Sequence, residues 1–231
     1  WWERNHALAD VVLRQGDEVW IASPEDLEAH RITHPDELIR PLFQVRRVKL
    51  IGGKKNRAHY AHYIAWLSDP RFDRLESLDL AGMDDLQDLG FLGHVAGLKE
   101  LNLSRCNLDD AKLGLLPKIS SLRRLSLNGN DLGAPTAFHL ANTFPELEEL
   151  HLSCPRIGTD AALHLAKLQS LKRLTLSGGN LTDPGLRRLT ALRNLEELDI
   201  RDTKVTPAGV AEFQKALPNC KVVWQQLPAK D

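Results

Sequence analysis

Leucine, or isoleucine in one place, recurs along most of this chain in the pattern L-x-x-L-x-L, and mainly polar residues fill the positions between. Six copies begin at residues 75, 98, 122, 147, 171 and 195, so neighbouring copies are 23 to 25 residues apart. Within each copy, the alternation of apolar and polar positions predicts a short strand with one buried face and one exposed face. Over these residues the chain therefore repeats one structural unit at a nearly constant period.

Each predicted strand is followed by signals for a turn and a short helix. A further apolar residue comes about five positions after the last strand leucine, and a helix start follows it. In the segment TDPGLRRLTALRN (182–194), Asp183 can cap a helix, and Pro184 fits the first helical position, where a missing N–H costs nothing. Similar segments begin at residues 159 and 206. The unit is therefore strand, turn, short helix, turn.

Self-similarity with a period of about 20–29 residues predicts an α/β fold, the leucine-rich-repeat solenoid. We expect a right-handed coil, shaped like a horseshoe, with parallel strands on the concave face and short helices on the convex face. One unit cannot bury its leucines alone, so neighbouring units must stack to form a shared core. A charge in the middle of that core, such as Leu150→Asp, should split the solenoid.

The pattern predicts three regions in one continuous solenoid. These are divergent amino-terminal repeats and a cap over 1–74, six repeats over 75–219, and a capping half-repeat over 220–231. Weaker strand patterns occur at 16–22 and 45–51, and helices are expected at 23–30, 34–43 and 57–69. At the carboxyl end, Trp224 is expected to shield the last layer of the core.

The motif L-x-x-L-x-L, followed by an apolar residue, by TDPGL or TPAGV and by ALPNCKVVW, resembles bacterial leucine-rich repeats of the cysteine-containing, F-box-like class, which are common in planctomycetes. This resemblance covers residues 75–226. The lead-in EVWIASPEDLEAH…PLFQVRRVKL is similar to the segment that precedes such repeats in planctomycete repeat-companion proteins. The resemblance implies a recognition scaffold without catalysis and supplies no ligand.

Stacked strands would align their exposed residues in columns along the concave face. The third motif position alternates in sign between neighbouring repeats, through Glu100, Arg124, Glu149, Arg173 and Glu197. Adjacent strands lie about 4.8 Å apart, so these charges can pair across strands and fix the register. They could instead form a charged rail for a partner, but charges that pair sideways are less available to a ligand.

The fifth and seventh motif positions hold mostly small polar residues and predict a shallow, open trough beside the charges. We expect a partner in the concavity to touch residues of these two columns: Trp20, Lys49, Asp79, Asn102, Ser126, Asn128, His151, Ser153, Thr175, Asp199 and Arg201. Trp20 is the best anchor if it projects outward, because Trp is enriched among residues that dominate binding energy. It could instead pack under the cap.

Charge is nearly balanced over the whole chain, with a formal net charge of −1, which argues against general nucleic-acid binding. The stretch 40–74 is an exception, because it holds nine basic residues against two acidic ones. A basic patch there could bind an anion, nucleic acid or an acidic protein surface, or could be a solvated turn; its candidates are Arg46, Arg47, Lys54, Lys55 and Arg57. The segment GGKKNR (52–57) lacks the spacing of a phosphate-binding loop.

No catalytic motif is recognisable in the sequence, and we expect neither an enzyme nor a cofactor. The pairs His59–His62 and His151–Cys154 lack the third and fourth ligands of a structural metal site, so no metal is predicted. Three cysteines are an odd number, which argues against a complete disulfide framework and favours a reducing, cytoplasmic location. No apolar run approaches the roughly 20 residues that span a bilayer, so no membrane partner is expected.

These patterns predict a monomeric, non-catalytic scaffold that binds another protein on the concave face and the adjacent loops. Two alternatives remain open. The first is an anion-binding or nucleic-acid-binding module that uses the basic end at 40–74. The second is a module that positions an effector or enzyme upstream of Trp1, since a chain that opens with Trp rather than Met indicates a fragment, a processed form or the ordered part of a longer protein.

Overall fold

A computed structural model describes residues 18–23, 26–32, 44–49, 75–84, 86 and 88–225 of the 231-residue chain. The strands in this part are β1 (Glu18–Ser23), β2 (Asp26–Ile32), β3 (Gln44–Lys49), β4 (Ser77–Asp79), β5 (Glu100–Asn102), β6 (Arg124–Ser126), β7 (Glu149–His151), β8 (Arg173–Thr175), β9 (Glu197–Asp199) and β10 (Lys221–Val223). The helices are a 3₁₀ turn, η4 (Gly90–His94), and the α-helices α3 (Asp110–Leu113), α4 (Ala134–Thr143), α5 (Thr159–Leu165), α6 (Asp183–Leu189) and α7 (Pro207–Ala216).

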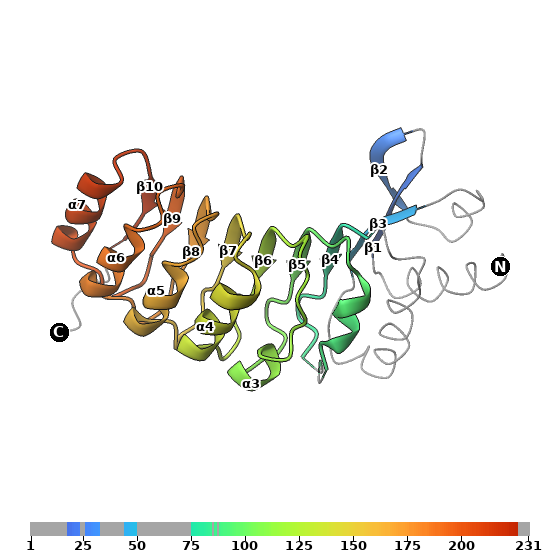
Figure 1. Ribbon diagram of the computed structural model, residues 1–231, viewed down its shortest axis with the longest axis horizontal. Helices are drawn as coiled ribbons and strands as arrows, with labels where there is room; N and C mark the ends of the chain where they lie inside the picture. The colour runs from blue at the N-terminus through green and yellow to red at the C-terminus, as the bar shows by residue number, and fades with distance from the viewer. Residues whose placement is uncertain are drawn as a thin grey trace.

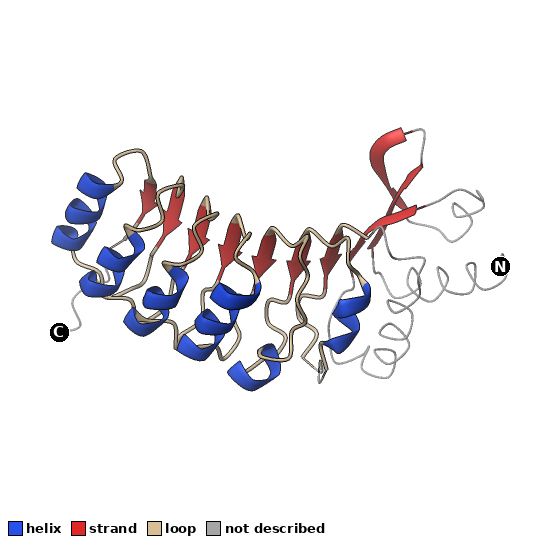
Figure 2. Cartoon of the chain, viewed as in Figure 1, coloured by secondary structure: helices blue, strands red, loops and turns tan. Residues whose placement is uncertain are grey.

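The strands form one sheet in the order β10-β9-β8-β7-β6-β5-β4-β3-β1-β2 (Figure 1). From β3 to β10 every neighbouring pair is parallel, and the central leucines of successive repeats face one another, as Leu125 faces Leu150. Strands line the inner side of the arc and helices line its outer side (Figure 2). The predicted α/β leucine-rich-repeat solenoid is confirmed, and connections of this kind between parallel strands are right-handed in nearly all proteins.

The core is a continuous stack of the motif leucines. Those that begin, centre and end each motif have exposed fractions of at most 4%, the largest being that of Leu195. Residues from the helices complete each layer, among them Leu140, Leu165, Leu189 and Phe213. Full burial of one leucine side chain is worth about 1.5–3 kcal/mol relative to exposure. Each repeat therefore depends on its neighbours for most of its stabilisation.

In five of the six repeats, the turn after the strand has a left-handed backbone at the eighth motif position, and Cys154 in the repeat that begins at 147 is the exception. Glycine occupies this position three times, as Gly82, Gly129 and Gly178, with φ of 78°, 70° and 71°. Arg105 and Asp202 take the same position with φ of 57° and 55°. Glycine adopts this conformation without steric cost, whereas other residues are strained there. A glycine at this position, such as Gly129 in LNGN, therefore marks the turn just after a strand.

The amino-terminal strands depart from the repeat pattern. Strand β3 continues the parallel register, since Val48 faces Leu78. In contrast, β1 is antiparallel to both β2 and β3, so the segment 16–22 is not a further parallel repeat. The helix predicted at 23–30 is wrong, because Asp26–Ile32 is strand β2. Its Ser-Pro start favours a helix locally, but pairing along the edge of β1 decides the outcome, as tertiary context often overrides propensity. The helices expected at 34–43 and 57–69 lie outside the described residues, and the division into regions at 74 and 220 stays a prediction.

Strand β10 continues the parallel sheet after the repeat that begins at 195. The N–H of Cys220 donates to Leu217 O, as the opening leucines of earlier repeats do, so Cys220 takes an opening-leucine place. Strand β10 then starts one residue early, and Val222 faces Leu198. Trp224 packs against the core, and its indole N–H donates to Val205 O at 3.3 Å. The prediction that Trp224 covers the last layer is confirmed.

Candidate functional site: the strand face

The predicted fifth-position residues lie side by side across the inner face. In register, Lys49 faces Asp79, and the line continues through Asn102, Ser126, His151, Thr175 and Asp199. From Asp79 onward these residues are half-buried, as are Asn128 and Ser153 in the seventh column, whereas Arg201 is exposed. We call the fifth and seventh motif positions of the repeats from Asp79 to Arg201 the polar trough. The structure confirms their alignment, and their contact with a partner stays a prediction.

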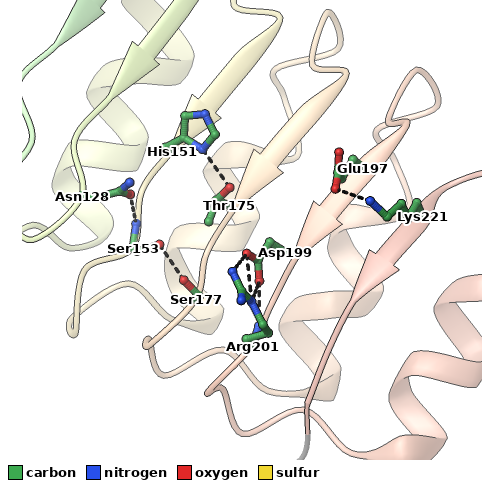
Figure 3. Close-up of polar contacts among 9 residues, drawn as sticks. All are labelled: Asn128, His151, Ser153, Thr175, Ser177, Glu197, Asp199, Arg201 and Lys221. Atoms are coloured by element: carbon green, nitrogen blue, oxygen red, sulfur yellow. Dashed lines mark hydrogen bonds and ion pairs between the residues drawn. The ribbon is translucent and has the colours of Figure 1, made fainter. Parts of the chain in front are cut away.

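Side chains in the carboxyl half of the trough bond to one another across strands (Figure 3). Asn128 Oδ1 accepts from the backbone N–H of Ser153 at 2.8 Å, and the hydroxyl oxygens of Ser153 and Ser177 lie 2.8 Å apart. His151 Nδ1 lies 2.9 Å from Thr175 Oγ1. These contacts fix the side chains in place and use part of their hydrogen-bonding capacity.

His151 also joins the trough to the charged third column. Its Nε2 lies 2.7 Å from Glu149 Oε1, and the guanidinium of Arg173 donates to Glu149 Oε2 at 2.5 Å and 3.0 Å. Partial burial alone would raise the pKa of Glu149, but the hydrogen bonds from Arg173 and His151 outweigh it and hold the pKa below its ordinary value. Glu149 is therefore ionised at neutral pH, and its charge is matched within the protein.

Thr175, His151 and Glu149 have the connectivity of a hydroxyl, base and carboxylate relay. Nucleophilic catalysis by such a relay also needs donors that stabilise the developing oxyanion, usually backbone N–H groups beside the nucleophile. The N–H of Leu176, next to Thr175, donates instead to Asp199 O at 2.8 Å within the stack. The arrangement therefore orients polar groups on an open face and lacks this catalytic element at the adjacent residue.

The alternating charges of the third column form separate pairs. Arg124 pairs with Glu100, Arg173 with Glu149, and Lys221 with Glu197, the last at 2.9 Å. The expectation of cross-strand ion pairs is confirmed for the first two, and the pair of Lys221 with Glu197 adds one that the predicted column did not include. Exposed pairs of this kind contribute about 0–1 kcal/mol each, so they fix register and solubility more than stability.

At the end of the trough, the charge of Asp199 is neutralised by Arg201, two residues further along the chain. Arg201 Nη2 lies 2.6 Å from Asp199 Oδ2 (Figure 3). Partial burial raises the pKa of Asp199, but hydrogen bonds from the side chain and N–H of Arg201 outweigh it, so the pKa lies below its usual range. The trough therefore ends in a neutralised pair.

A second charged column, which sequence reasoning missed, runs along the second motif position. Lys99 lies 3.2 Å from Glu76, and Lys172 lies 2.8 Å from Glu148. A depression of about 360 Å³ beside this column is lined by Glu146, Glu148, Ser170, Lys172, Asn194 and Glu196. The signal was present in the sequence as doubled like charges at the strand entries, such as Glu148–Glu149.

A second depression, of about 230 Å³, lies on the trough itself over β4 to β7. It is lined by Ser77, Leu78, Asp79, Glu100, Leu101, Asn102, Arg124, Ser126, Glu149 and His151. Its cause is a short side chain, because Ser77 occupies the third column where the next strands carry Glu100 and Arg124. We call it the β4–β7 hollow. Sequence reasoning placed Ser77 in its column but drew nothing from its small size.

Trp20 does not continue the trough in register. It faces Arg47 on β3 and Arg31 on β2, because β1 runs antiparallel to both strands. Lys49 faces Glu18 instead. The Trp20 side chain lies outside the described side chains, so its role as an anchor stays a prediction.

The predicted basic patch is described only in part. Arg47 is exposed on β3, beside the first residues of the trough. The side chain of Arg46, and residues Lys54, Lys55 and Arg57, lie outside the described part of the chain. Anion binding at this end therefore stays a prediction.

All three cysteines are buried free thiols. The Sγ of Cys106 donates to Leu80 O at 3.1 Å, and that of Cys154 donates to Leu127 O at 3.3 Å. Burial raises the pKa of Cys106 to about 12 and that of Cys220 to about 11. The thiols are therefore protonated at neutral pH, where they support turns and do not act as nucleophiles.

Within the described ranges, no three His, Cys, Asp or Glu side chains gather as metal ligands would. His151 faces the trough while Cys154 is buried, so this pair does not converge, and His59 and His62 lie outside the described residues. None of the helices in the described part has the length and apolar character needed to cross a membrane.

Comparison with family models identifies repeats of one kind. A model described as Leucine Rich repeat matches residues 167–189 and 191–213, and another, Leucine Rich Repeat, matches 97–119. These segments overlap the repeats that begin at 98, 171 and 195. No curated protein matches the chain. The matches support a leucine-rich-repeat protein.

Solved structures give the same fold. Internalin C2 from Listeria monocytogenes has a TM-score of 0.52 and 22% identity, covering 66% of this chain and 62% of its own. A Bacteroides fragilis protein (TM-score 0.49, 17% identity) covers 73% and 61%, and a Leptospira interrogans leucine-rich-repeat protein (0.46, 23% identity) covers 67% and 44%. The chain thus spans less than two thirds of each of these proteins, and the likeness to internalin C2 concerns the fold alone.

Proposed function

We propose that this leucine-rich-repeat protein is a non-catalytic recognition module that binds a partner protein across the polar trough and the adjacent loops. Leucine-rich-repeat domains generally serve protein–protein interaction, and a solenoid offers an extended inner surface for it. The observation that carries the proposal is the trough. Its polar side chains are held in register across six strands, on the face that the helices leave open (Figure 2).

The trough favours specific binding of modest affinity. Its side chains are small and polar, and aromatic residues make up only 6% of the chain, whereas aromatic anchors dominate the tightest interfaces. Cross-strand bonds such as His151 to Thr175 already hold the surface in one arrangement. Preorganisation of this kind lowers the entropic cost of association.

We also propose that the repeats belong to the cysteine-containing, F-box-like class that resembles those of planctomycetes, and that the protein works as a monomer in the reducing cytoplasm. The buried thiols of Cys106 and Cys154 support this, because each donates to the carbonyl just after the strand of the preceding repeat. Protonated, unpaired thiols persist where disulfides are kept reduced.

The test compares capture of a partner by the wild-type protein and by a variant whose trough is blocked. In the triple variant Ser126→Tyr, His151→Tyr and Thr175→Tyr, bulky rings fill the middle of the trough. A matched control, Ala111→Tyr, Ala191→Tyr and Ala211→Tyr, adds the same rings at exposed positions on the helix side. Proteins captured from the native host are quantified by mass spectrometry, and circular dichroism confirms that all forms are folded.

We expect one protein to be captured by the wild type and by the control, and to fall at least about tenfold with the trough variant, the effect of losing roughly 1.4 kcal/mol. The captured protein is then purified and titrated by calorimetry against the same three forms. Equal binding by wild type and trough variant would refute the trough as the binding surface.

A further inference from the structure

The two halves of the trough differ in how much hydrogen-bonding capacity they leave unused. Between β7 and β9, His151, Thr175 and Asp199 all bond to neighbouring side chains. In the β4–β7 hollow, the hydroxyls of Ser77 and Ser126 have no partner within the described structure. The amide of Asn102 uses only Oδ1, which accepts from the N–H of Ser104 at 3.1 Å. The hollow therefore retains groups that can bind a ligand.

Three carboxylates line the hollow, and Asp79 is the one that forms no ion pair in the described structure. Glu100 pairs with Arg124, and Glu149 pairs with Arg173. In the described structure the carboxylate of Asp79 makes one hydrogen bond, from its Oδ1 to the N–H of Ala81 at 2.9 Å, and no ion pair. Oδ2 is left for a donor from outside. Lys49 faces Asp79 in register and has an interaction of its own.

The size of the hollow limits what can enter it. Its volume, about 230 Å³, is below the roughly 300–1,000 Å³ of pockets that enclose a drug-sized ligand. A single long side chain fits better. Asp79, Ser77 and Ser126 present oxygen acceptors to the space, and the guanidinium of Arg124, which also lines it, is paired with Glu100. The entering group should therefore be a cation with several N–H donors.

We infer that the β4–β7 hollow binds a lysine or arginine side chain of the partner protein, with Asp79 as its counter-ion. The inference rests on the proposed function and names the chemistry of the partner segment. The hydroxyls of Ser77 and Ser126 accept further hydrogen bonds from the cationic head. The free amide N–H of Asn102 donates to a carbonyl of the same segment.

Short peptides test the site directly. The probes are Ac-Gly-Gly-Arg-Gly-Gly-NH₂, its lysine analogue, and its citrulline analogue, which keeps the shape of arginine without the charge. Each is titrated into ¹⁵N-labelled protein, and backbone amide shifts are followed by NMR. We expect saturable shifts at residues 77–81, 100–104 and 124–128 with the basic peptides, and about fivefold weaker binding of citrulline, as loss of an exposed ion pair implies.

The variant Asp79→Asn keeps the acceptor for Ala81 N–H and removes only the charge. We expect it to bind the arginine peptide about fivefold more weakly than wild type, and added salt to reduce the difference. The control Glu196→Gln removes an exposed carboxylate outside the hollow and should leave the affinity unchanged. Equal affinity of Asp79→Asn and wild type, equal affinity for citrulline and arginine, or no saturable shift overturns the inference.

Capture of the partner separates this inference from the proposed function. If the tyrosine triple variant loses the partner while Asp79→Asn retains it at full affinity, the trough is the binding surface and the basic-side-chain site is wrong. If the triple variant also retains the partner, the proposed function itself is wrong.

Discussion

Asn130 lies almost fully buried and uses its whole side-chain amide to join two repeats. Its Oδ1 accepts from the N–H groups of Cys106 and Leu108 at 3.0 Å and 3.1 Å. Its Nδ2 donates to Leu103 O at 2.9 Å and to Leu127 O at 2.8 Å. A buried amide that meets four backbone groups is costly to remove, because its backbone partners lose a hydrogen bond in the interior, and only Leu127 O keeps another donor, the thiol of Cys154.

Asn130→Ala is expected to lower the free energy of unfolding by about 3 kcal/mol or more, since it leaves buried N–H and C=O groups unsatisfied. Urea unfolding followed by circular dichroism measures the change. The control Asn194→Ala removes an exposed asparagine whose amide makes one bond, to Gln169 O at 2.9 Å, and should cost less than about 1 kcal/mol. Similar losses in the two variants would contradict the role given to Asn130.

Single residues of the trough show what the sequence could and could not predict. The columns follow from the two-residue period of a strand, so Ser126 and His151 could be placed beside each other without coordinates. The sequence does not predict which side chains form hydrogen bonds across strands, because that depends on their rotamers and lengths. The sequence treats Ser126 and Ser153 alike, yet Ser153 bonds to Ser177 while Ser126 opens onto the hollow.

Helix α4 is capped from the neighbouring repeat. Gly133 at its start has no side chain, and Asp110 from α3 takes the capping role. Asp110 Oδ1 accepts from Gly133 N–H at 2.9 Å and from the N–H and hydroxyl of Thr136 at 3.2 Å and 2.6 Å. Asp183 contacts the start of α7 in a related way, because it accepts from the N–H and hydroxyl of Thr206 at 2.8 Å and 2.6 Å, while Thr206 itself caps the helix by accepting from Gly209 N–H at 3.2 Å. Successive helix starts are therefore linked.

Asp110→Ala is expected to cost about 1–2 kcal/mol at pH 7, the usual cost of losing a helix cap. Partial burial raises the pKa of Asp110, but hydrogen bonds from Thr136 and Gly133 outweigh it and hold the pKa below its ordinary value of 3.8. Its stabilisation is therefore full above pH 3.8 and is lost as pH falls through the lower folded-state pKa. Urea unfolding at pH 7 and at a pH well below 3.8 should show the gap between variant and wild type narrowing in acid.

The control for this prediction is Asp131→Ala. Arg156 pairs with Asp110 at 3.0 Å and with Asp131 at 3.3 Å, but the side chain of Asp131 is 70% exposed and does not cap α4. It should cost less than about 1 kcal/mol at either pH. An equal loss in both variants would assign the effect to Arg156 rather than to the cap.

Among the elements, sequence reasoning succeeded where a signal is repeated and failed where it occurs once. Helices α6 and α7 start at Asp183 and Pro207, within the segments TDPG and TPAG that predict them, but Thr182 and not Asp183 occupies the N-cap position of α6. The capping by Asp110 was not foreseen, because it joins residues 23 to 26 positions apart through a geometry that only stacking creates. Strand β2 was mistaken for a helix because its partner, β1, was taken for a parallel repeat.

The solenoid as a whole has a core whose layers depend on their neighbours. In such a stack, stability is a sum of repeat terms and interface terms, so damage in the middle removes two interfaces and damage at an end removes one. Leu150 is fully buried at the centre of the sheet, between Leu125 and Leu174. Val222 holds the corresponding place on the terminal strand β10 and is only partly buried.

Leu150→Asp is expected to destabilise the protein by more than about 4 kcal/mol, because it removes a buried leucine and buries an unpaired charge. Hydrogen exchange measured by mass spectrometry should show lost protection in the repeats on both sides of β7. Val222→Asp, the matched change at the end of the stack, should expose only the last repeat. If Leu150→Asp also affects only its own repeat, the layers do not share one interior.

Two adjacent residues of like charge precede or begin the strand in four successive repeats, and the sign changes from one repeat to the next. The pairs are Arg123 and Arg124, Glu148 and Glu149, Lys172 and Arg173, and Glu196 and Glu197. The electrostatic period is therefore two copies, twice the structural one. Excision of 171–194 alone would set Glu149 against Glu197, and like charges directly opposite are unfavourable. Excision of 147–194 would set Arg124 against Glu197, an opposite pair. Insertion or deletion of an even number of repeats should therefore be tolerated better than that of an odd number.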